Sequence, residues 1–306
     1  MQRDDHQDSD RDSDPVTTEP ELPVSDHNIA DRPLVTNGPD ANVPLASLIV
    51  SGVDTIKFLQ GQLTNDLNEI DAHNPFIAAI CTPEGKLVTI VRLEMINAER
   101  IRLITYREHL TALLERLVRF KLRIKVDVEV EEQAWSVIDD DDNTSPLWPL
   151  DAPLVAVDQP SERQALLLPV NFTEQRLAHG AIHLPTDAPG ELLVAGVPSL
   201  VARGVSFSKG CYVGQELVAR TDSRGAKPPI SLFVARFRVE DASPWEALST
   251  PTQLMTDSDS EAGEIRALLV QGTSVAVSGW VKRRWSETIG LRVASTMLTL
   301  PTAPLS

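Results

Sequence analysis

Residues 209–216 read Lys-Gly-Cys-Tyr-Val-Gly-Gln-Glu, a run of unusual composition. Gly210 and Gly214 bracket Cys211 and Tyr212, so the backbone there can turn sharply and a ligand can approach it closely. The residues that follow, Gln-Glu-Leu-Val-Ala-Arg over 215–220, are compatible with a helix. The spacing therefore predicts a glycine-bounded turn that carries a thiol just before the start of a helix.

Two features of this turn favour a reactive thiolate at Cys211. The positive end of the helix dipole lies on one side of the thiol, and the Lys209 cation lies on the other. The alternative is a buried cysteine in a tight turn. Spacing alone does not distinguish the two.

Two other stretches carry information of the same kind. Residues 58–67 read Phe-Leu-Gln-Gly-Gln-Leu-Thr-Asn-Asp-Leu, and residues 119–126 read Arg-Phe-Lys-Leu-Arg-Ile-Lys-Val. Together with residues 209–216, Arg220 and the pair Arg224-Gly225, they resemble the marker segments of the YgfZ family. The resemblance spans about residues 45 to 293.

The YgfZ family shares its fold with the aminomethyltransferase of the glycine cleavage system. The resemblance therefore implies an α+β, three-domain aminomethyltransferase-like fold around a central channel, with a C-terminal β-barrel. The expected parts are a disordered acidic tail over 1–43 and an N-terminal α+β domain over 44–142. A middle α+β domain over 143–227 follows and ends in residues 209–216, the signature segment, and a barrel domain covers 228–306.

The periodicity of the sequence supports a mixed fold. Leucines and a valine fall at helical spacing between Leu110 and Val118, and apolar residues alternate with polar ones from Leu122 to Val130, as in a strand with one buried face. Four short β-like runs follow position 228, over 232–239, 264–270, 274–279 and 288–293. Helices and strands mixed in this way favour an α+β architecture.

The resemblance also implies a function. It predicts a folate-binding accessory protein for iron–sulfur cluster assembly or repair, with an indirect effect on tRNA modification. The expected cofactor is tetrahydrofolate or a related folate, with no stable metal, and the expected partners are the assembly machinery or cluster-containing client enzymes. The alternatives are a tetrahydrofolate-dependent aminomethyl transferase and a non-enzymatic scaffold with the same fold.

The site that the resemblance implies has three kinds of residue. Cys211 is its reactive thiol, with Lys209 as the catalytic partner, and Gly210 and Gly214 form the turn. Folate needs polar partners for its pterin and cations or backbone donors for its carboxylates. The residues expected to supply or border these groups are Gln60, Asn65, Arg92, Glu191, Tyr212, Gln215, Glu216 and Arg220, and the alternative for them is ordinary surface polarity.

Two departures from the related aminomethyltransferases bear on this site. Those enzymes carry an acid just after a glycine-rich turn, whereas the matching segment here, Gly85 to Ile90, has none. This argues against glycine-cleavage-type transfer. The usual pocket acid is also missing from the segment Val194 to Pro198, and Glu191 is the nearest substitute.

Composition excludes several other classes of protein. The chain has 306 residues and a net charge of −16, and residues 1–40 hold eleven acids and three arginines, which is half of that charge. An acidic surface does not attract phosphate backbones, so direct nucleic-acid binding is not expected. Residues 1–43 are too polar to bury a core, and they are either an interaction tail or a solubilising extension. We expect a cytoplasmic protein with no membrane association, because there is no apolar signal segment, and take a monomer as the default state.

Three other patterns are more readily explained by structure than by chemistry. Cys81 lies in an apolar run and is expected to be buried, and two cysteines cannot by themselves ligate a typical cluster. His179 and His183 have zinc-compatible spacing, but Gly180 between them favours a turn. The cationic run 282–284 between Trp280 and Trp285 is expected at a barrel edge or channel rim rather than on nucleic acid.

Overall fold

The computed structural model describes residues 45–70, 74–131, 133–137, 145, 147, 149–157, 172–187, 192–223, 228–285, 290–293 and 299–300. The acidic segment 1–43 and the aspartate run 139–142 lie outside these residues. None of the described helices combines the length and the apolar composition that a bilayer crossing requires.

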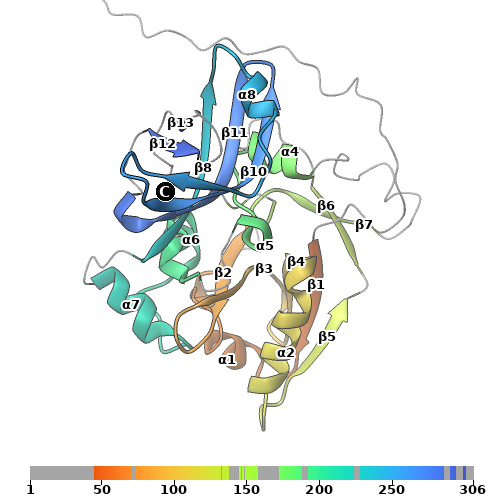
Figure 1. Ribbon diagram of the computed structural model, residues 1–306. Coiled ribbons are helices and arrows are strands. Elements are labelled where there is room, and N and C mark those ends of the chain that lie inside the picture. The colour runs from red at the N-terminus through yellow and green to blue at the C-terminus, as the bar shows by residue number, and fades with distance from the viewer. Residues whose placement is uncertain are drawn as a thin grey trace, which may run out of the picture. The chain divides into compact units, whose positions relative to one another are not determined.

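A five-stranded antiparallel sheet is formed by residues before position 132. Its strands are β1 (Leu45–Ser51), β2 (Phe76–Cys81), β3 (Leu87–Asn97), β4 (Arg100–Tyr106) and β5 (Asp127–Glu131), and their order is β2-β3-β4-β1-β5. All six residues of β2 and the first six of β1 are buried. The strands β1 and β2 (Figure 1) are therefore covered on both faces of the sheet.

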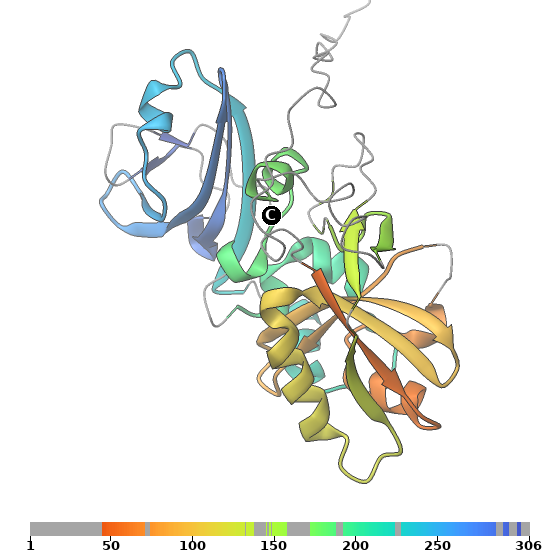
Figure 2. The same cartoon turned by 90° about the vertical axis from the view of Figure 1, so that its right-hand side faces the viewer.

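Helices α1 (Thr55–Gln60) and α2 (Leu110–Phe120) cover one face of this sheet, with the short 3-10 turns η2 (Leu67–Glu69) and η3 (Arg107–His109) beside them. Figure 2 shows α2 lying along the sheet. Leu113 and Leu117 are fully buried against the sheet, as the helical periodicity predicts. Val118 is wrongly included in that buried face, because it turns outward and is 44% exposed.

The strand expected from Leu122 begins only at Asp127. The chain reverses direction between α2 and β5, so residues 121–125 form a turn in which Arg123 has a φ of +65° and Leu122 is 79% exposed. β5 is an edge strand that pairs with β1. Its other edge faces solvent, and the apolar side chains of β5 are therefore less buried than the alternating pattern predicts.

The other face of the sheet contacts the middle of the chain. This segment contains β6 (Ala134–Val137), β7 (Leu154–Val157), α4 (Phe172–Ala178), α5 (Leu184–Asp187), η4 (Val194–Gly196), α6 (Pro198–Gly204) and α7 (Gln215–Ser223). One apolar core joins residues of the first sheet, this segment and the C-terminal sheet, and Ile77, Leu200 and Val234 are among its members. α7 begins at Gln215, which confirms the expected helix after the signature segment.

The C-terminal residues form a six-stranded sheet. Its elements are β8 (Ile230–Arg238), β9 (Thr252–Met255), β10 (Glu261–Gln271), β11 (Ser274–Lys282), β12 (Leu291–Val293) and β13 (Thr299–Leu300), with α8 (Ser243–Glu246) and η5 (Arg283–Trp285). The order is β13-β12-β9-β10-β11-β8. The four predicted runs correspond to β8, β10, β11 and β12. Among the described residues β13 and β8 end the sheet, so the closed barrel and the domain boundaries stay predictions.

Candidate functional site

The signature segment 209–216 packs on the other marker segment, residues 58–67. The Lys209 ammonium donates to the backbone carbonyls of Gln60, Leu63 and Asn65 at 2.8, 2.7 and 2.8 Å. An ammonium has three donors, so all of them are used here. Burial lowers the pKa of Lys209 to about 8, an effect that the Asp66 carboxylate opposes. The side chain therefore remains mostly protonated at neutral pH.

Backbone and hydroxyl hydrogen bonds extend this contact. The Val213 amide donates to the Gly61 carbonyl at 3.1 Å, and the Ser206 amide donates to the Thr64 carbonyl at 3.0 Å. The Thr64 hydroxyl donates to the Gly204 carbonyl at 2.5 Å and accepts from a β2 amide. Residues 61–64 and 204–213, which lie well over a hundred residues apart in sequence, are thus joined by hydrogen bonds to their backbone groups.

Of the two signature glycines, only Gly214 is required by its surroundings. It has a φ of +88°, and an added Cβ would lie 2.5 Å from the Thr82 carbonyl oxygen and 2.7 Å from the Cys81 sulfur. L-residues with a side chain rarely adopt such a backbone conformation. Gly210 has no atom within 4 Å of the corresponding position. The close approach expected of this turn therefore occurs at Gly214, against the end of β2.

Cys81 is buried, as its apolar run predicts. Its thiol donates to the Val213 carbonyl at 3.0 Å, and burial raises its pKa to about 12 although the Arg116 guanidinium opposes the shift. A thiol that stays protonated is neither a nucleophile nor a ready metal ligand. Cys81 instead fixes the signature segment to β2.

Cys211 has the opposite environment, because its side chain is exposed. The neighbouring Tyr212 is buried, and its ring lies 5.2 Å from the Lys209 ammonium. Burial also raises the pKa of Tyr212, so its hydroxyl stays protonated. The turn therefore anchors itself through residues 209 and 212 and presents the thiol of residue 211 to solvent.

The polar residues of α7 line the outer side of the same region. Glu216 and Arg220 are exposed and form an ion pair one helical turn apart. The backbone N–H of Gln215 donates to the Tyr212 carbonyl at 3.2 Å and so ties the helix start to the turn. Arg224, Gly225 and Glu191 lie outside the described residues.

Two of the three predicted amide side chains, those of Gln60 and Asn65, are engaged within their own loop. The Gln60 amide donates to the Asp66 carboxylate at 2.7 Å and accepts from the Leu67 backbone at 2.9 Å. The Asn65 amide donates to the Ile77 carbonyl at 2.8 Å. These contacts shape the loop whose carbonyls hold Lys209, and they account for both side chains without a ligand.

Arg92 contacts a different part of the molecule from the signature segment. Its guanidinium donates to the Ala152 carbonyl at 2.5 Å and pairs with Glu94 at 3.3 Å. Burial lowers its pKa, although Glu94 and Asp151 both oppose this shift. The Nε of Arg92 is buried and has no hydrogen-bond partner in the part of the chain that the structure describes.

Asp151 is a candidate site residue that sequence reasoning could not identify. Its carboxylate is buried and accepts through Oδ2 from Ser145 and Arg203, while Oδ1 has no hydrogen-bond partner among the described residues. Asp151 lies in the proline-rich stretch 143–165, where periodicity identifies nothing. Among the described residues, no cluster of three or more His, Cys, Asp or Glu suited to a metal ion is formed.

Comparison with known proteins gives several relatives of this chain. An uncharacterised protein of Haemophilus influenzae is 30% identical over 194 residues, or 58% of this chain and 66% of that protein. The tRNA-modifying protein YgfZ of Yersinia enterocolitica is 27% identical over 248 residues, 69% of this chain and 71% of that one. The mitochondrial iron-sulfur cluster assembly factor IBA57 homolog of Mycosarcoma maydis is 29% identical over 231 residues, 64% of this chain and 57% of that one.

The chain thus spans between 57% and 71% of the length of these relatives. No protein-family model matches it. The glycine cleavage system aminomethyltransferase T of Bartonella henselae has a similar fold, with a TM-score of 0.65 over 87% of this chain and 84% of that one, at 10% identity. These similarities make the chain a relative of the YgfZ proteins and of the iron–sulfur cluster assembly factor, built on the aminomethyltransferase fold.

Proposed function

We propose that this chain is a folate-binding accessory protein of the cytoplasm that assembles or repairs iron–sulfur clusters and thereby affects tRNA modification. The observation that carries the proposal is the contact between segments 58–67 and 209–216, which buries Lys209 and exposes Cys211. The names of the relatives, a tRNA-modifying protein and a cluster assembly factor, support the same role. The partners would be the assembly machinery or its client enzymes.

In this proposal Cys211 and Lys209 have different roles. The exposed thiol is the group that meets the cluster or the partner. Lys209 is a positioning residue, because its three donors all hold the loop 60–65. The three-domain arrangement and the C-terminal barrel of the aminomethyltransferases belong to the same proposal.

Folate binding is proposed at two buried atoms, Asp151 Oδ1 and Arg92 Nε, which have no hydrogen-bond partner among the residues that the structure covers. A pterin presents neighbouring donors and acceptors on its edge, which a buried carboxylate and guanidinium can match. Asp151 would supply the acid that is missing from residues 194–198. When bound, tetrahydrofolate supplies a one-carbon carrier, and Arg220 is the candidate cation for its carboxylates.

Aminomethyl transfer is the second candidate, and one observation disfavours it. Residues 85–90, which end the turn between β2 and β3 and begin β3, hold no acid that could act on folate there, and the acid of the turn, Glu84, precedes them. A scaffold without folate is the third candidate. It would be favoured if tetrahydrofolate did not bind at Asp151 and Arg92.

Calorimetric titration of the full chain with tetrahydrofolate tests the folate part. We expect binding by the wild type and by Cys211→Ala, and at least tenfold weaker binding by Asp151→Asn. Arg238→Ala, an exposed arginine at the end of β8, is the matched control and should bind as the wild type does. No binding by the wild type would leave the scaffold as the remaining reading.

A cellular assay tests the part played by the thiol. In cells that lack this protein, the Cys211→Ala variant should fail to restore the activity of cluster-containing enzymes although it binds folate. Full restoration by Cys211→Ala would remove the thiol from the function. Methylene release from an aminomethyl donor, catalysed by the purified chain, would instead support the transferase.

A further inference from the structure

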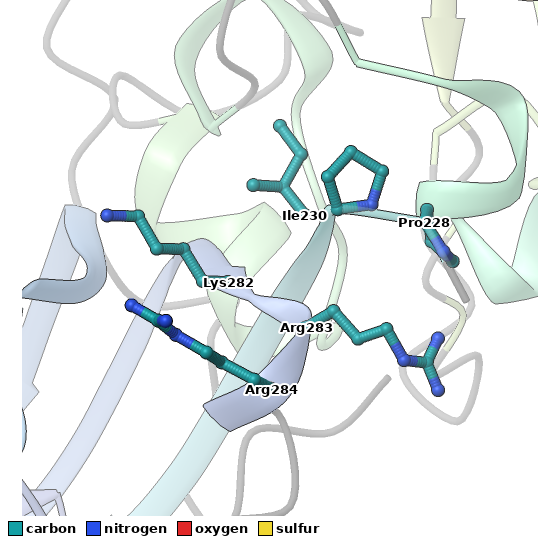
Figure 3. Close-up of a pocket in the computed structure, with 6 residues that line it drawn as sticks. Pro228, Ile230, Lys282, Arg283 and Arg284 are labelled. Atoms are coloured by element: carbon teal, nitrogen blue, oxygen red, sulfur yellow. The ribbon is translucent and has the colours of Figure 1, made fainter. Parts of the chain in front are cut away.

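A hollow in the surface of the C-terminal region combines an apolar lining with a row of cations. It has a volume of about 610 Å³ and is lined by Pro228, Pro229, Ile230, Lys282, Arg283 and Arg284. Figure 3 shows the proline and isoleucine side chains beside the three cationic ones. None of these residues has a part in the site described above.

The walls of the hollow are held in place by backbone hydrogen bonds. Ile230 and Lys282 are paired in the ladder between β8 and β11. The Arg283 amide donates to the Pro229 carbonyl at 2.9 Å, which fixes the start of η5 against the start of β8. Pro228 and Pro229 add chain stiffness, because their φ angles are restricted. The surface is therefore preformed, which lowers the entropic cost of binding.

The cations of the hollow are accessible to a ligand. Arg284 is exposed, and its guanidinium lies 5.2 Å from the Trp285 ring centroid. Lys282 pairs with Glu261 at 2.9 Å, and both are part of the surface. An ion pair of this kind contributes little and exchanges readily for another carboxylate. Lys282 and Arg284 extend toward the same side in Figure 3, whereas Arg283 extends the other way.

We propose that this hollow binds an acidic segment of a partner protein. Carboxylates of the segment would pair with Lys282 and Arg284, and an apolar side chain between them would contact Pro228 and Ile230. Charge complementarity supports this occupant, since three consecutive cations are an exception in a chain with a net charge of −16. A nucleic acid is disfavoured because its backbone of closely spaced phosphates offers no aliphatic side chain to the apolar wall of Pro228 and Ile230.

The test measures fluorescence anisotropy of a labelled twelve-residue peptide of alternating glutamate and leucine, titrated with the full chain. We expect saturable binding that weakens with added salt. The double variant Lys282→Glu/Arg284→Glu should bind at least tenfold more weakly. Arg238→Glu is the matched control, because it reverses an exposed charge at the opposite end of β8 and should change binding less than twofold.

Two further arms separate the sources of affinity. A peptide with serine in place of leucine should bind more weakly, because the prolines then contact no apolar group. A single-stranded oligonucleotide of equal charge should bind more weakly than the glutamate–leucine peptide. The proposal is overturned if the wild type does not bind the glutamate–leucine peptide, or if Lys282→Glu/Arg284→Glu and Arg238→Glu weaken its binding equally. It is also overturned if the oligonucleotide binds as tightly as that peptide. Folate titration of the same variants should be unchanged, which separates this surface from the proposed function.

Discussion

The two buried cations of the described residues, Arg176 and Lys209, are held in different ways. Arg176 forms a two-pronged pair with the Asp187 carboxylate at 2.7 and 3.1 Å and donates to the Ser278 hydroxyl at 3.0 Å. Lys209 donates to three backbone carbonyls and forms no ion pair within the described part of the chain, although the charge of Asp66 acts on it. One cation is neutralised by a direct ion pair, and the other is held by carbonyl dipoles with an acid only nearby.

This difference separates a neutral tie from a charged one. The Arg176–Asp187 pair is neutral as a whole and joins the middle segment to β11 through Ser278. The Lys209 charge persists beneath the turn that carries Cys211, and the nearby Asp66 carboxylate is bonded to Gln60 and Asn68 instead. The positive charge of Lys209 is thus kept at this turn, whereas that of Arg176 is cancelled by Asp187.

The largest effect is expected at the neutralised cation. Arg176→Met should lower the free energy of unfolding by about 3–5 kcal/mol, because it leaves the Asp187 carboxylate buried without its partner. Urea denaturation of the two proteins measures the difference.

The double variant Arg176→Met/Asp187→Leu is the control for that experiment. It should recover at least half of the loss, since both buried charges are then absent. A double variant no more stable than Arg176→Met would mean that the lost stability comes from packing and not from the unpaired carboxylate.

The next effect concerns the turn over Lys209. Gly214→Ala should cost about 2–4 kcal/mol, because the new methyl group would clash with the Thr82 carbonyl at a positive φ. Gly210→Ala is the matched control in the same turn and should change stability by about 0.5 kcal/mol or less, since the space beside it is open. Equal losses in the two variants would contradict the close approach at Gly214.

Lys209→Met should cost about 2–3 kcal/mol. The substitution removes three hydrogen bonds to a charged donor and leaves the Leu63 carbonyl buried without a partner. Arg220→Met removes a cation of the same region that is exposed and should cost about 0.5 kcal/mol or less. A Lys209 variant as stable as the Arg220 variant would show that the carbonyls are satisfied by water.

The sequence was informative about segments and not about their contacts. Residues 58–67 and 209–216 are predicted as markers from their resemblance to a known family, but the hydrogen bonds between Lys209 and the loop 60–65 join positions too far apart in sequence for periodicity to predict. Burial of Cys81 follows from its apolar run, and its bond to Val213 does not. Asp151 lies in a stretch without a repeat, so only the folded chain reveals that its carboxylate is buried.

The smallest effect at neutral pH is expected at His183, which packs between the rings of Tyr106 and Phe172 with centroids 4.9 and 5.0 Å away. Burial lowers the pKa of His183 to about 3, and the charges of Arg176 and His109 act in the same direction. An unfolded histidine binds its proton near pH 6.5, so below that pH the unfolded chain takes up a proton that the folded chain refuses.

Stability from this residue is therefore present above pH 6.5 and is lost as the pH falls from 6.5 toward 3. The wild type should lose about 1 kcal/mol more than His183→Gln between pH 7 and pH 5.5. Glu108, whose carboxylate lies 4.0 Å from the His183 Nε2, is exposed and should reduce this difference only slightly. Urea denaturation at several pH values measures it, and parallel stability curves for the two proteins would mean that His183 accepts a proton in the folded state, next to the Arg176 guanidinium that Asp187 neutralises.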